Sequence, residues 1–220
     1  MEVKILSEKN SLLNQFISEI RDETIQRDSM RFRRNMERIG EIMAYEISKH
    51  LTYEEAEVTT PLGIANVNLP VEKPVLATIL RAGLPLHQGL LNYFDKSENS
   101  FISAFRKYSK DGSFQIELEY ISCPSLEGKT LILCDPMLAT GSSMVLAFNS
   151  LIRNGRPKNT HIVTVIACHD GVKYLQKHLC AKNVTLWAAA VDEELTVKSY
   201  IIPGLGDAGD LAYGAKEHFQ

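Results

Sequence analysis

The stretch Leu131-Ile-Leu-Cys-Asp-Pro-Met-Leu-Ala-Thr-Gly-Ser-Ser143 is the part of the sequence that indicates the fold most directly. Its first four residues are apolar and lie between Lys129 and Asp135, a pattern typical of a short buried strand. A turn of small residues follows, and residues 144–151 have the composition of a helix. Free backbone N–H groups and the helix dipole both favour negative charge at a helix N-terminus, so this order of elements predicts an anion site.

The side chains of this turn suit a sugar phosphate. Thr140, Ser142 and Ser143 add hydroxyl donors, and Gly141 allows an oxygen to approach the backbone closely. Asp135 would repel a phosphate placed directly on it, but as a hydrogen-bond acceptor it suits the hydroxyls of a ribose. We therefore expect a ribose 5-phosphate site. The alternative is an ordinary helix N-cap, and the turn matches neither a Walker loop nor a dinucleotide-binding fingerprint.

Composition and charge limit the class of protein. The 220 residues are 45% hydrophobic and 23% charged, which predicts one globular domain over residues 1–220. The net charge of −3 provides no overall basic field that would recruit nucleic acid. The four cysteines form no Cys-x-x-Cys pair and indicate a reducing compartment. Residues 1–20 contain no apolar signal core and no run reaches membrane-span length, so we expect a cytoplasmic protein without a membrane segment.

The densest basic cluster, Arg31-Phe-Arg-Arg34, falls inside a long predicted helix, residues 28–51. Met36, Ile39 and Ile47 recur along this helix at helical spacing and are expected to pack into the core. We interpret the arginines as a solvated helix face or a salt-bridged subunit contact rather than an RNA site.

Apolar runs alternate with helical segments along most of the chain. Strands buried on both faces of a parallel sheet are predicted at 75–80, 131–134, 161–168 and 184–191. Helices are predicted at 11–21, 28–51, 84–93, 144–151 and 171–179. This order predicts an α/β fold with an open, doubly wound and mostly parallel sheet flanked by helices.

Two β-hairpins are expected beside this alternation. Residues 57–60 and 64–69 flank Pro61-Leu-Gly63 and predict an arm or an edge addition to the sheet. Residues 101–105 and 115–121 flank a polar, Gly-containing stretch and predict a protruding flap. Such a flap would close over a reactive intermediate and exclude water, and the alternative is a solvated hairpin.

Charged residues follow two of the predicted strands. Arg81 comes directly after residues 75–80, at the sheet edge where α/β proteins bind ligands. It is therefore a candidate for binding an anionic group, with a structural arginine capping the sheet edge as the alternative. Arg106 and Lys107 stand at the base of the flap and suit a polyphosphate.

The tail segment Tyr200-Ile-Ile-Pro-Gly-Leu-Gly-Asp-Ala-Gly-Asp210 is unusual in composition. It holds three glycines, one proline and two acids, which predicts a shaped loop rather than a helix or a regular strand. The free backbone N–H and C=O groups of such a loop would read a small planar heterocycle with alternating donors and acceptors.

Three segments together resemble the uracil phosphoribosyltransferase family, whose members have the type I phosphoribosyltransferase fold. They are the 135–143 stretch, the 200–210 tail and Ile79-Leu-Arg-Ala-Gly-Leu84, and they occur in the family's order and at similar spacing. Two departures from the family pattern are Leu211, where a basic residue is common, and residues 192–199, which differ from the usual Asp-x-x-Leu-Asn form.

The resemblance implies transfer of the 5-phosphoribosyl group from phosphoribosyl diphosphate to N1 of uracil, giving UMP and diphosphate in pyrimidine salvage. It implies that Arg81 and Arg106 hold the diphosphate, and that Asp207 lies near the ribose, the diphosphate or its Mg²⁺. These three residues and Asp135 form the implied catalytic set. Phosphoribosyl diphosphate would also contact the loop residues Asp135, Pro136, Met137, Leu138, Ala139, Thr140, Gly141, Ser142 and Ser143. The implied uracil pocket, largely of main-chain atoms, contains Ile201, Gly206, Asp207 and Ala208.

The resemblance also implies a cofactor and partners. Mg²⁺ would be bound mainly through the diphosphate. A homodimer or higher homo-oligomer is expected, with the 28–51 helix and the 57–69 arm at the subunit contact. GTP is an effector in part of the family.

Two other functions are compatible with the same fold. A regulatory RNA-binding protein of pyrimidine metabolism would present a basic face, and the acidic net charge and the intact 200–210 tail argue against it. A phosphoribosyltransferase for a purine or for orotate would close its base site with a different tail.

Overall fold

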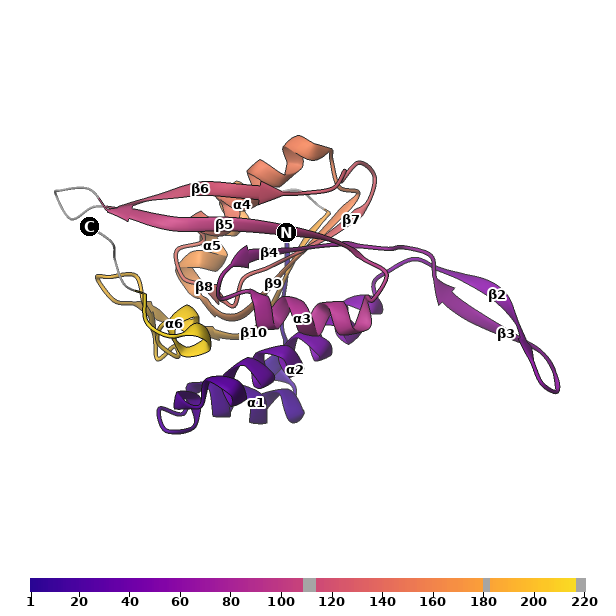
Figure 1. Cartoon of the computed structure of the whole chain (residues 1–220), viewed down its shortest axis with the longest axis horizontal. Helices are drawn as coiled ribbons and strands as arrows, with labels where there is room; N and C mark the ends of the chain where they lie inside the picture. The colour runs from indigo at the N-terminus through magenta and orange to yellow at the C-terminus, as the bar shows by residue number, and fades with distance from the viewer. Residues whose placement is uncertain (109–113, 180–182, 217–220) are drawn as a thin grey trace.

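The computed structural model describes residues 1–108, 114–179 and 183–216, and the side chains of residues 105–117 lie outside this description. Its main sheet has the strand order β1 (Glu2–Ile5), β10 (Val184–Asp192), β9 (Asn159–Cys168), β7 (Thr130–Cys134), β4 (Val75–Leu80), β5 (Glu98–Tyr108) and β6 (Phe114–Ser122) (Figure 1). Neighbours are parallel from β1 through to β5, and β6 pairs antiparallel with β5. The prediction of an open, mostly parallel sheet is confirmed.

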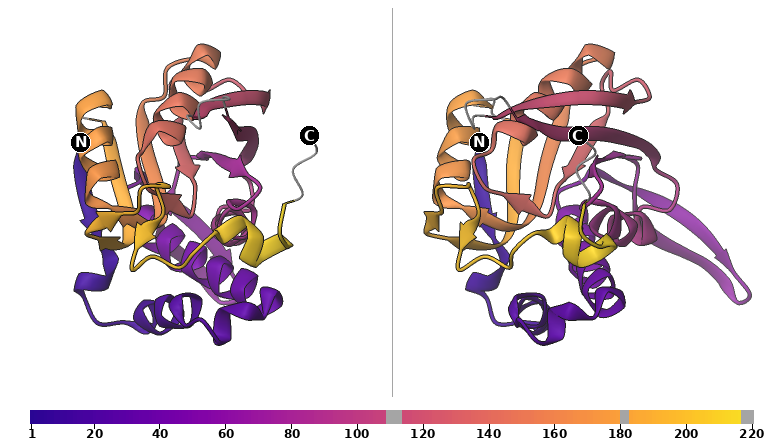
Figure 2. Two further views of the ribbon diagram at one scale, coloured as in Figure 1. Left: turned by 90° about the vertical axis from the view of Figure 1, so that its left-hand side faces the viewer. Right: turned by 60° about the vertical axis from the view of Figure 1, so that its left-hand side comes forward.

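Helices cover both faces of the sheet (Figures 1 and 2). One core contains residues of α1 (Leu12–Arg21), α2 (Ser29–Ser48) and α3 (Leu84–Tyr93), and the other contains residues of α4 (Ser142–Leu151) and α5 (His169–His178). Strand β7 contributes to both cores because successive side chains of a strand point to opposite faces. Ile132 and Cys134 join the first core, and Leu131 and Leu133 join the second.

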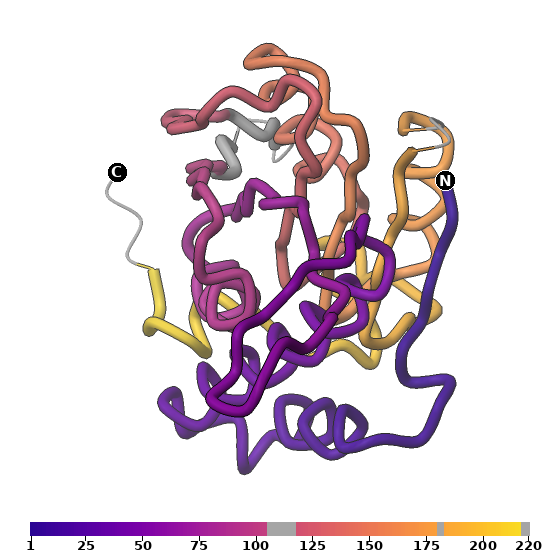
Figure 3. Tube along the Cα trace, turned by 90° about the vertical axis from the view of Figure 1, so that its right-hand side faces the viewer, coloured from indigo at the N-terminus to yellow at the C-terminus, as the bar shows by residue number. Residues whose placement is uncertain are grey.

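Short elements complete the sheet and its connections. Strand β1 pairs with β10, and in Figure 3 the indigo N-terminal segment runs beside that orange strand. Strand β8 (Met137–Leu138) also pairs with β9. The 3-10 helices are η1 (Leu6–Glu8), η2 (Ile25–Arg27) and η3 (Ile152–Asn154).

The predicted arm is a two-stranded hairpin of β2 (Tyr53–Thr60) and β3 (Gly63–Pro70), which projects from the rest of the chain (Figure 1). Its first strand begins four residues earlier than the 57–60 prediction. Leu62 at the tip is fully exposed and Ile64 is 69% exposed. The flap prediction is confirmed for the backbone of β5 and β6, which extend toward the side where α6 (Ala208–Tyr213) lies.

The tail prediction is wrong in part. Residues 200–210 were expected to form neither strand nor helix, but β12 (Ile201–Ile202) pairs with β11 (Glu194–Leu195) and α6 begins at Ala208. The helix forms despite Gly209 because the Asp207 carboxylate caps it, accepting the backbone N–H of Asp210 at 3.0 Å.

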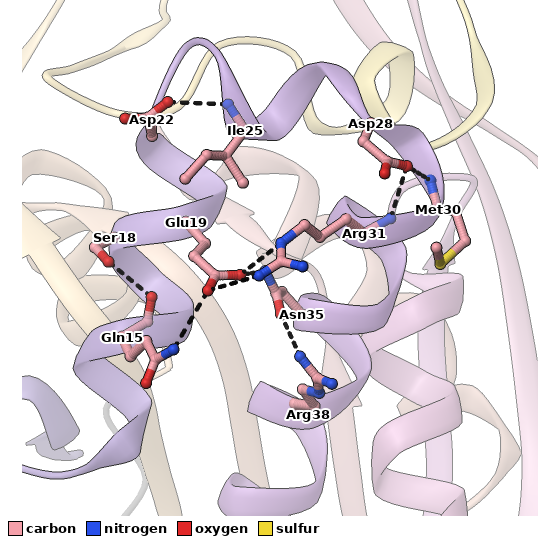
Figure 4. Close-up of polar contacts among 10 residues, drawn as sticks. All are labelled: Gln15, Ser18, Glu19, Asp22, Ile25, Asp28, Met30, Arg31, Asn35 and Arg38. Atoms are coloured by element: carbon pink, nitrogen blue, oxygen red, sulfur yellow. Dashed lines mark hydrogen bonds and ion pairs between the residues drawn. The ribbon is translucent and has the colours of Figure 1, made fainter.

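The basic cluster of α2 is paired within the chain. Arg31 forms a two-pronged ion pair with Glu19 of α1, with both N···O distances 3.0 Å, and Asn35 donates to the same carboxylate (Figure 4). These bonds lower the pKa of Glu19, the bond from Arg31 most of all. Arg33 donates to the carbonyl of Ala212, and Arg34 pairs with Glu37 at 2.7 Å. The Arg31 and Arg34 side chains are about half exposed, which agrees with a solvated helix face, and their salt-bridge partners lie on the same chain. The alternative of a subunit contact stays a prediction.

Two further expectations concern the burial of the cysteines and the presence of membrane-spanning helices. Cys134 and Cys168 are fully buried, as predicted, and burial raises the pKa of the Cys134 thiol to about 12. Within the described ranges, no helix combines the length and the apolar character needed to cross a membrane.

Candidate active site

A cleft of about 900 Å³ lies at the carboxyl ends of β4 and β7. This is the edge of an open α/β sheet at which ligands bind. The cleft is lined by parts of six segments: residues 79–82, 103–104, 135–144, 199–201, 206–210 and 215–216. Of the predicted site residues, those on its wall are Arg81, Asp135, Met137, Leu138, Ala139, Thr140, Gly141, Ser143, Ile201, Gly206, Asp207 and Ala208.

The 135–143 loop turns from β7 into α4. Gly141 takes φ +81°, a left-handed conformation that favours glycine, and α4 begins at Ser142. The Thr140 and Ser142 hydroxyl oxygens lie 2.8 Å apart. The carbonyl of Pro136 accepts the backbone N–H groups of Val165 and Ile166, which fixes the loop to β9. Pro136 and Ser142 are not among the residues that line the cleft, and their contact with phosphoribosyl diphosphate stays a prediction.

The same loop packs backbone to backbone against α5. A Cβ atom placed on Gly171 would lie 2.5 Å from the carbonyl oxygen of Ala139 and 2.8 Å from that of Leu138. Gly171 therefore keeps the loop in position, although the sequence analysis gave it no role beyond a helix start. The available signal was a glycine in the first turn of a helix that follows a buried strand.

Asp135 follows β7 directly and is half-buried at the cleft. Burial raises the pKa of this carboxyl to about 7, and the backbone N–H of Met137 partly offsets the rise. A carboxyl group in this environment accepts hydrogen bonds from hydroxyl groups more favourably than it tolerates a phosphate.

Arg81 follows β4 and joins the tail to the sheet. Its Nη2 atom donates to the Asp210 carboxylate and to the carbonyl of Gly214, both at 2.8 Å. Its Nε atom is buried and has no hydrogen-bond partner among the described residues. Asp210 thus orients a residue predicted to bind an anion, a role that the sequence analysis did not assign to it. Arg106 lies in β5 opposite Ile116, and its side chain falls outside the described residues.

The 201–207 loop closes the other side of the cleft. Gly204 and Gly206 have φ values of +56° and +94°, and the Ile202–Pro203 peptide is cis, as is Leu80–Arg81. Ile201 and Ala208 are 5% and 4% exposed. Asp207 uses Oδ1 to cap α6, while its Oδ2 lies 3.7 Å from Lys216 Nζ. The loop therefore presents backbone atoms and one carboxylate to the cleft.

The parallel sheet and its cleft together place the chain in the type I phosphoribosyltransferase class. Within that class, a family model described as uracil phosphoribosyltransferase matches residues 7–215. The chain belongs to the uracil phosphoribosyltransferase family.

Individual relatives agree with this assignment. The chain is 56% identical over 216 residues to a uracil phosphoribosyltransferase of Porphyromonas gingivalis, covering 98% of this chain and 100% of the relative. It is 36% identical to that of Thermococcus gammatolerans, covering 94% of this chain and 92% of the relative. Among solved structures, the AQ2163 protein from Aquifex aeolicus superposes with a TM-score of 0.85 at 30% identity, covering 98% of this chain and 100% of that one.

Proposed function

We propose that this chain transfers the 5-phosphoribosyl group from phosphoribosyl diphosphate to N1 of uracil, giving UMP and diphosphate in pyrimidine salvage. The observation that carries the proposal is one cleft lined by both the 135–143 loop and the 201–207 loop, with Arg81 on its wall. The relatives from P. gingivalis and T. gammatolerans, both named uracil phosphoribosyltransferase, support the same reaction here.

The sugar phosphate occupies the 135–143 loop in this proposal. The 5-phosphate lies at the N-terminus of α4, where Thr140 and Ser143 add hydroxyl donors to the backbone N–H groups. Asp135 accepts hydrogen bonds from the ribose hydroxyls. Arg81, with Arg106 as the second arginine, holds the diphosphate, because a guanidinium group binds phosphate oxygens in pairs.

The base lies against the 201–207 loop and the start of α6. Uracil presents an acceptor, a donor and an acceptor along O4, N3–H and O2, and its proposed partners are main-chain groups of Gly206, Asp207 and Ala208, which line the cleft. Cytosine inverts two of these groups, which would leave buried partners unpaired. A main-chain site built for uracil therefore rejects cytosine strongly.

The reaction separates charge, because the diphosphate leaves C1 of the ribose. The bond between C1 of the ribose and the diphosphate oxygen breaks, and the diphosphate leaves with the electron pair. N1 of uracil attacks the opposite face of C1, with inversion. Arg81 stabilises the charge that develops on the leaving group, and the flap of β5 and β6 excludes water. No general base is assigned, since N1 of uracil can lose its proton late in the reaction.

Mg²⁺ is the proposed cofactor. Within the described ranges, no group of three or more His, Cys, Asp or Glu side chains is arranged to hold a metal ion. Mg²⁺ typically keeps several waters and binds through substrate phosphates and one or two carboxylates. Asp207 fits that requirement, because its Oδ2 does not cap α6 and the residue lines the cleft. The bound ion would neutralise charge on the diphosphate.

A homodimer or higher homo-oligomer is the proposed assembly. An isolated two-stranded hairpin is marginally stable in water. The arm exposes apolar side chains that a second copy of the chain would cover, among them Val58, Leu62 and Ile64. GTP as an effector rests on the family resemblance, and the reaction rate measured with and without GTP tests it.

The RNA-binding alternative is not favoured. Arg31, Arg33 and Arg34 contact groups within the chain, and the net charge is −3. Incubation with phosphoribosyl diphosphate, Mg²⁺ and uracil, followed by quantification of both products, tests the proposed reaction. UMP and diphosphate should form in equal amounts. Absence of UMP, together with binding to RNA, would overturn the proposal in favour of the alternative.

A further inference from the structure

An ion pair outside the cleft holds the 201–207 loop. Arg21, the last residue of α1, donates through Nη2 and Nη1 to the two carboxylate oxygens of Asp192, at 2.7 and 2.8 Å. Asp192 ends β10 and is only 7% exposed. Neither residue lines the cleft, so neither contacts a substrate bound there.

Both residues also bind the main chain of Gly204. The Arg21 Nη1 atom donates to the Gly204 carbonyl at 2.8 Å, and the Gly204 N–H donates to Asp192 Oδ2 at 2.9 Å. One ion pair thus satisfies both backbone groups of a single loop residue. Hydrogen bonds to charged groups are shorter and stronger than neutral ones, so this attachment is a firm one.

A second contact from the same region supports the loop. With the side-chain amide of Gln26, in η2, turned so that its nitrogen faces the two carbonyl groups, it donates to Leu205 at 2.9 Å and to Ile20 at 3.0 Å. The segment from Arg21 to Gln26 therefore touches two consecutive residues of the loop.

The loop needs such support because its turn is sharp. Gly204 has φ +56°, and a Cβ atom there would lie 2.2 Å from the carbonyl oxygen of Ile201. The residues that line the cleft, Gly206 to Ala208, begin only two positions further along. A shift of Gly204 therefore displaces them, and small displacements of positioning groups reduce rates strongly.

We propose that Arg21 and Asp192 are positioning residues that set the affinity and selectivity for the base. This inference rests on the proposed function, since it assigns the 201–207 loop to uracil. The 135–143 loop, which forms the sugar-phosphate end of the cleft, has no hydrogen bond to the ion pair among the described residues. Loosening the ion pair therefore weakens recognition of uracil more than that of phosphoribosyl diphosphate, which it affects only through Asp207.

The test compares Arg21→Lys and Asp192→Asn with the parent enzyme. Lysine keeps the charge and loses the fork that binds both carboxylate oxygens, and asparagine keeps the shape and loses the charge. Arg31→Lys is the matched control, because Arg31 forms a similar two-pronged pair with Glu19 of α1 but makes no contact with the loop (Figure 4). Its KM values show the effect of weakening an ion pair of α1 that does not involve the loop.

Both test variants should raise the KM for uracil about tenfold and lower the preference for uracil over cytosine, with the KM for phosphoribosyl diphosphate changed less than about twofold. Arg31→Lys should leave both KM values within about twofold of the parent. Addition of millimolar methylguanidinium to Arg21→Ala should restore part of the uracil affinity, because the Arg21 side chain is 22% exposed and its site is reachable.

Test variants that behave like Arg31→Lys, or that change both KM values equally, would overturn the inference while leaving the proposed function intact. If the parent enzyme makes no UMP from uracil, the proposed function fails and the inference fails with it.

Discussion

Asp135 follows the fully buried strand β7 and sits half-buried at the cleft, where burial raises the pKa of its carboxyl to about 7. The folded-state pKa lies above the usual value near 3.8, so the native state binds more protons than the unfolded state between these two values. Stability due to this group is therefore present at low pH and is lost as the pH rises toward 7. A carboxyl group at this position lowers the free energy of unfolding at neutral pH, which is consistent with a functional rather than a structural role for Asp135.

Asp135→Asn should remove this pH dependence and most of the activity. Relative to the parent, the variant should gain on the order of 1–3 kcal/mol of unfolding free energy between pH 4 and pH 8, because asparagine carries no charge to desolvate. Its kcat/KM for phosphoribosyl diphosphate should fall. Urea unfolding of both proteins across this pH range checks the first part, and parallel stability curves would contradict it.

His161 is another titratable residue that burial strongly perturbs, at the opposite end of the parallel strands. It is 6% exposed and its Nδ1 accepts the indole N–H of Trp187 at 3.1 Å. The pKa of His161 is lowered to about 4, mainly by burial, with nearby His50 and Lys4 adding to the effect and Glu72 opposing it. The imidazole is therefore neutral in the folded protein at physiological pH.

His161→Gln should make the protein less sensitive to acid. The unfolded state binds more protons than the native state between about pH 6.5 and pH 4, so stability due to His161 is complete above this window and falls as the pH drops through it. The parent should lose about 2–3 kcal/mol more than the variant. Trp187 is the single tryptophan, so its fluorescence reports unfolding directly. Equal losses in both proteins would show that another group controls acid unfolding.

Between elements, the critical contact is that of α5 with the 135–143 loop. In an ordinary helix, replacing glycine by alanine stabilises by about 0.5–1 kcal/mol. At Gly171 the sign should reverse, because the added methyl would approach the Ala139 carbonyl oxygen to 2.5 Å and push the loop away.

Gly171→Ala should therefore lower the melting temperature and raise the KM for phosphoribosyl diphosphate about tenfold, with a smaller effect on the KM for uracil. Thermal unfolding and steady-state kinetics measure the two effects. An alanine variant that is more stable and equally active would show that the loop is not held by this contact.

The sequence predicts best those elements whose signal is local. The bounds of β4 and α3 agree with prediction, because a continuous apolar run ends at Arg81 and a proline stands in the first turn of the helix. Strand β1 was not predicted, because charged and apolar residues alternate over only four positions. The strand depends on pairing with β10. Helix α6 was not predicted either, because its stability comes from the Asp207 cap rather than from composition.

The residues of the candidate site also fall into those that the local sequence indicates and those that it does not. Residues at strand ends, such as Arg81 and Asp135, could be identified because topology brings strand ends to one edge. The pairs Arg81–Asp210 and Arg21–Asp192 could not be identified, because they join residues 129 and 171 positions apart. Nothing in either local sequence indicates the partner.

For the whole molecule, the arm is the surface that a second copy of the chain would cover in the proposed assembly. Both strands of the hairpin are largely exposed, and its apolar tip lies away from both cores. A second copy of the chain that covers the tip would bury this surface, at about 25 cal/mol per Å² of apolar area.

Replacing Leu62 and Ile64 by serine should weaken self-association of the chain. Both side chains are exposed, so the fold of a single copy should not change. Sedimentation equilibrium of the parent and the variant measures the association constant. A parent that is monomeric at micromolar concentration would contradict the proposed assembly.

One cleft, in our assignment, holds phosphoribosyl diphosphate on the 135–143 loop and uracil on the main chain of the 201–207 loop. The most direct test measures kcat/KM for uracil, cytosine, orotate, hypoxanthine and adenine at saturating phosphoribosyl diphosphate and Mg²⁺. We expect UMP from uracil and no detectable nucleotide from the other four bases. Efficient turnover of another base would contradict the assignment of the 201–207 loop, and no turnover of any base would contradict the assignment of the cleft itself.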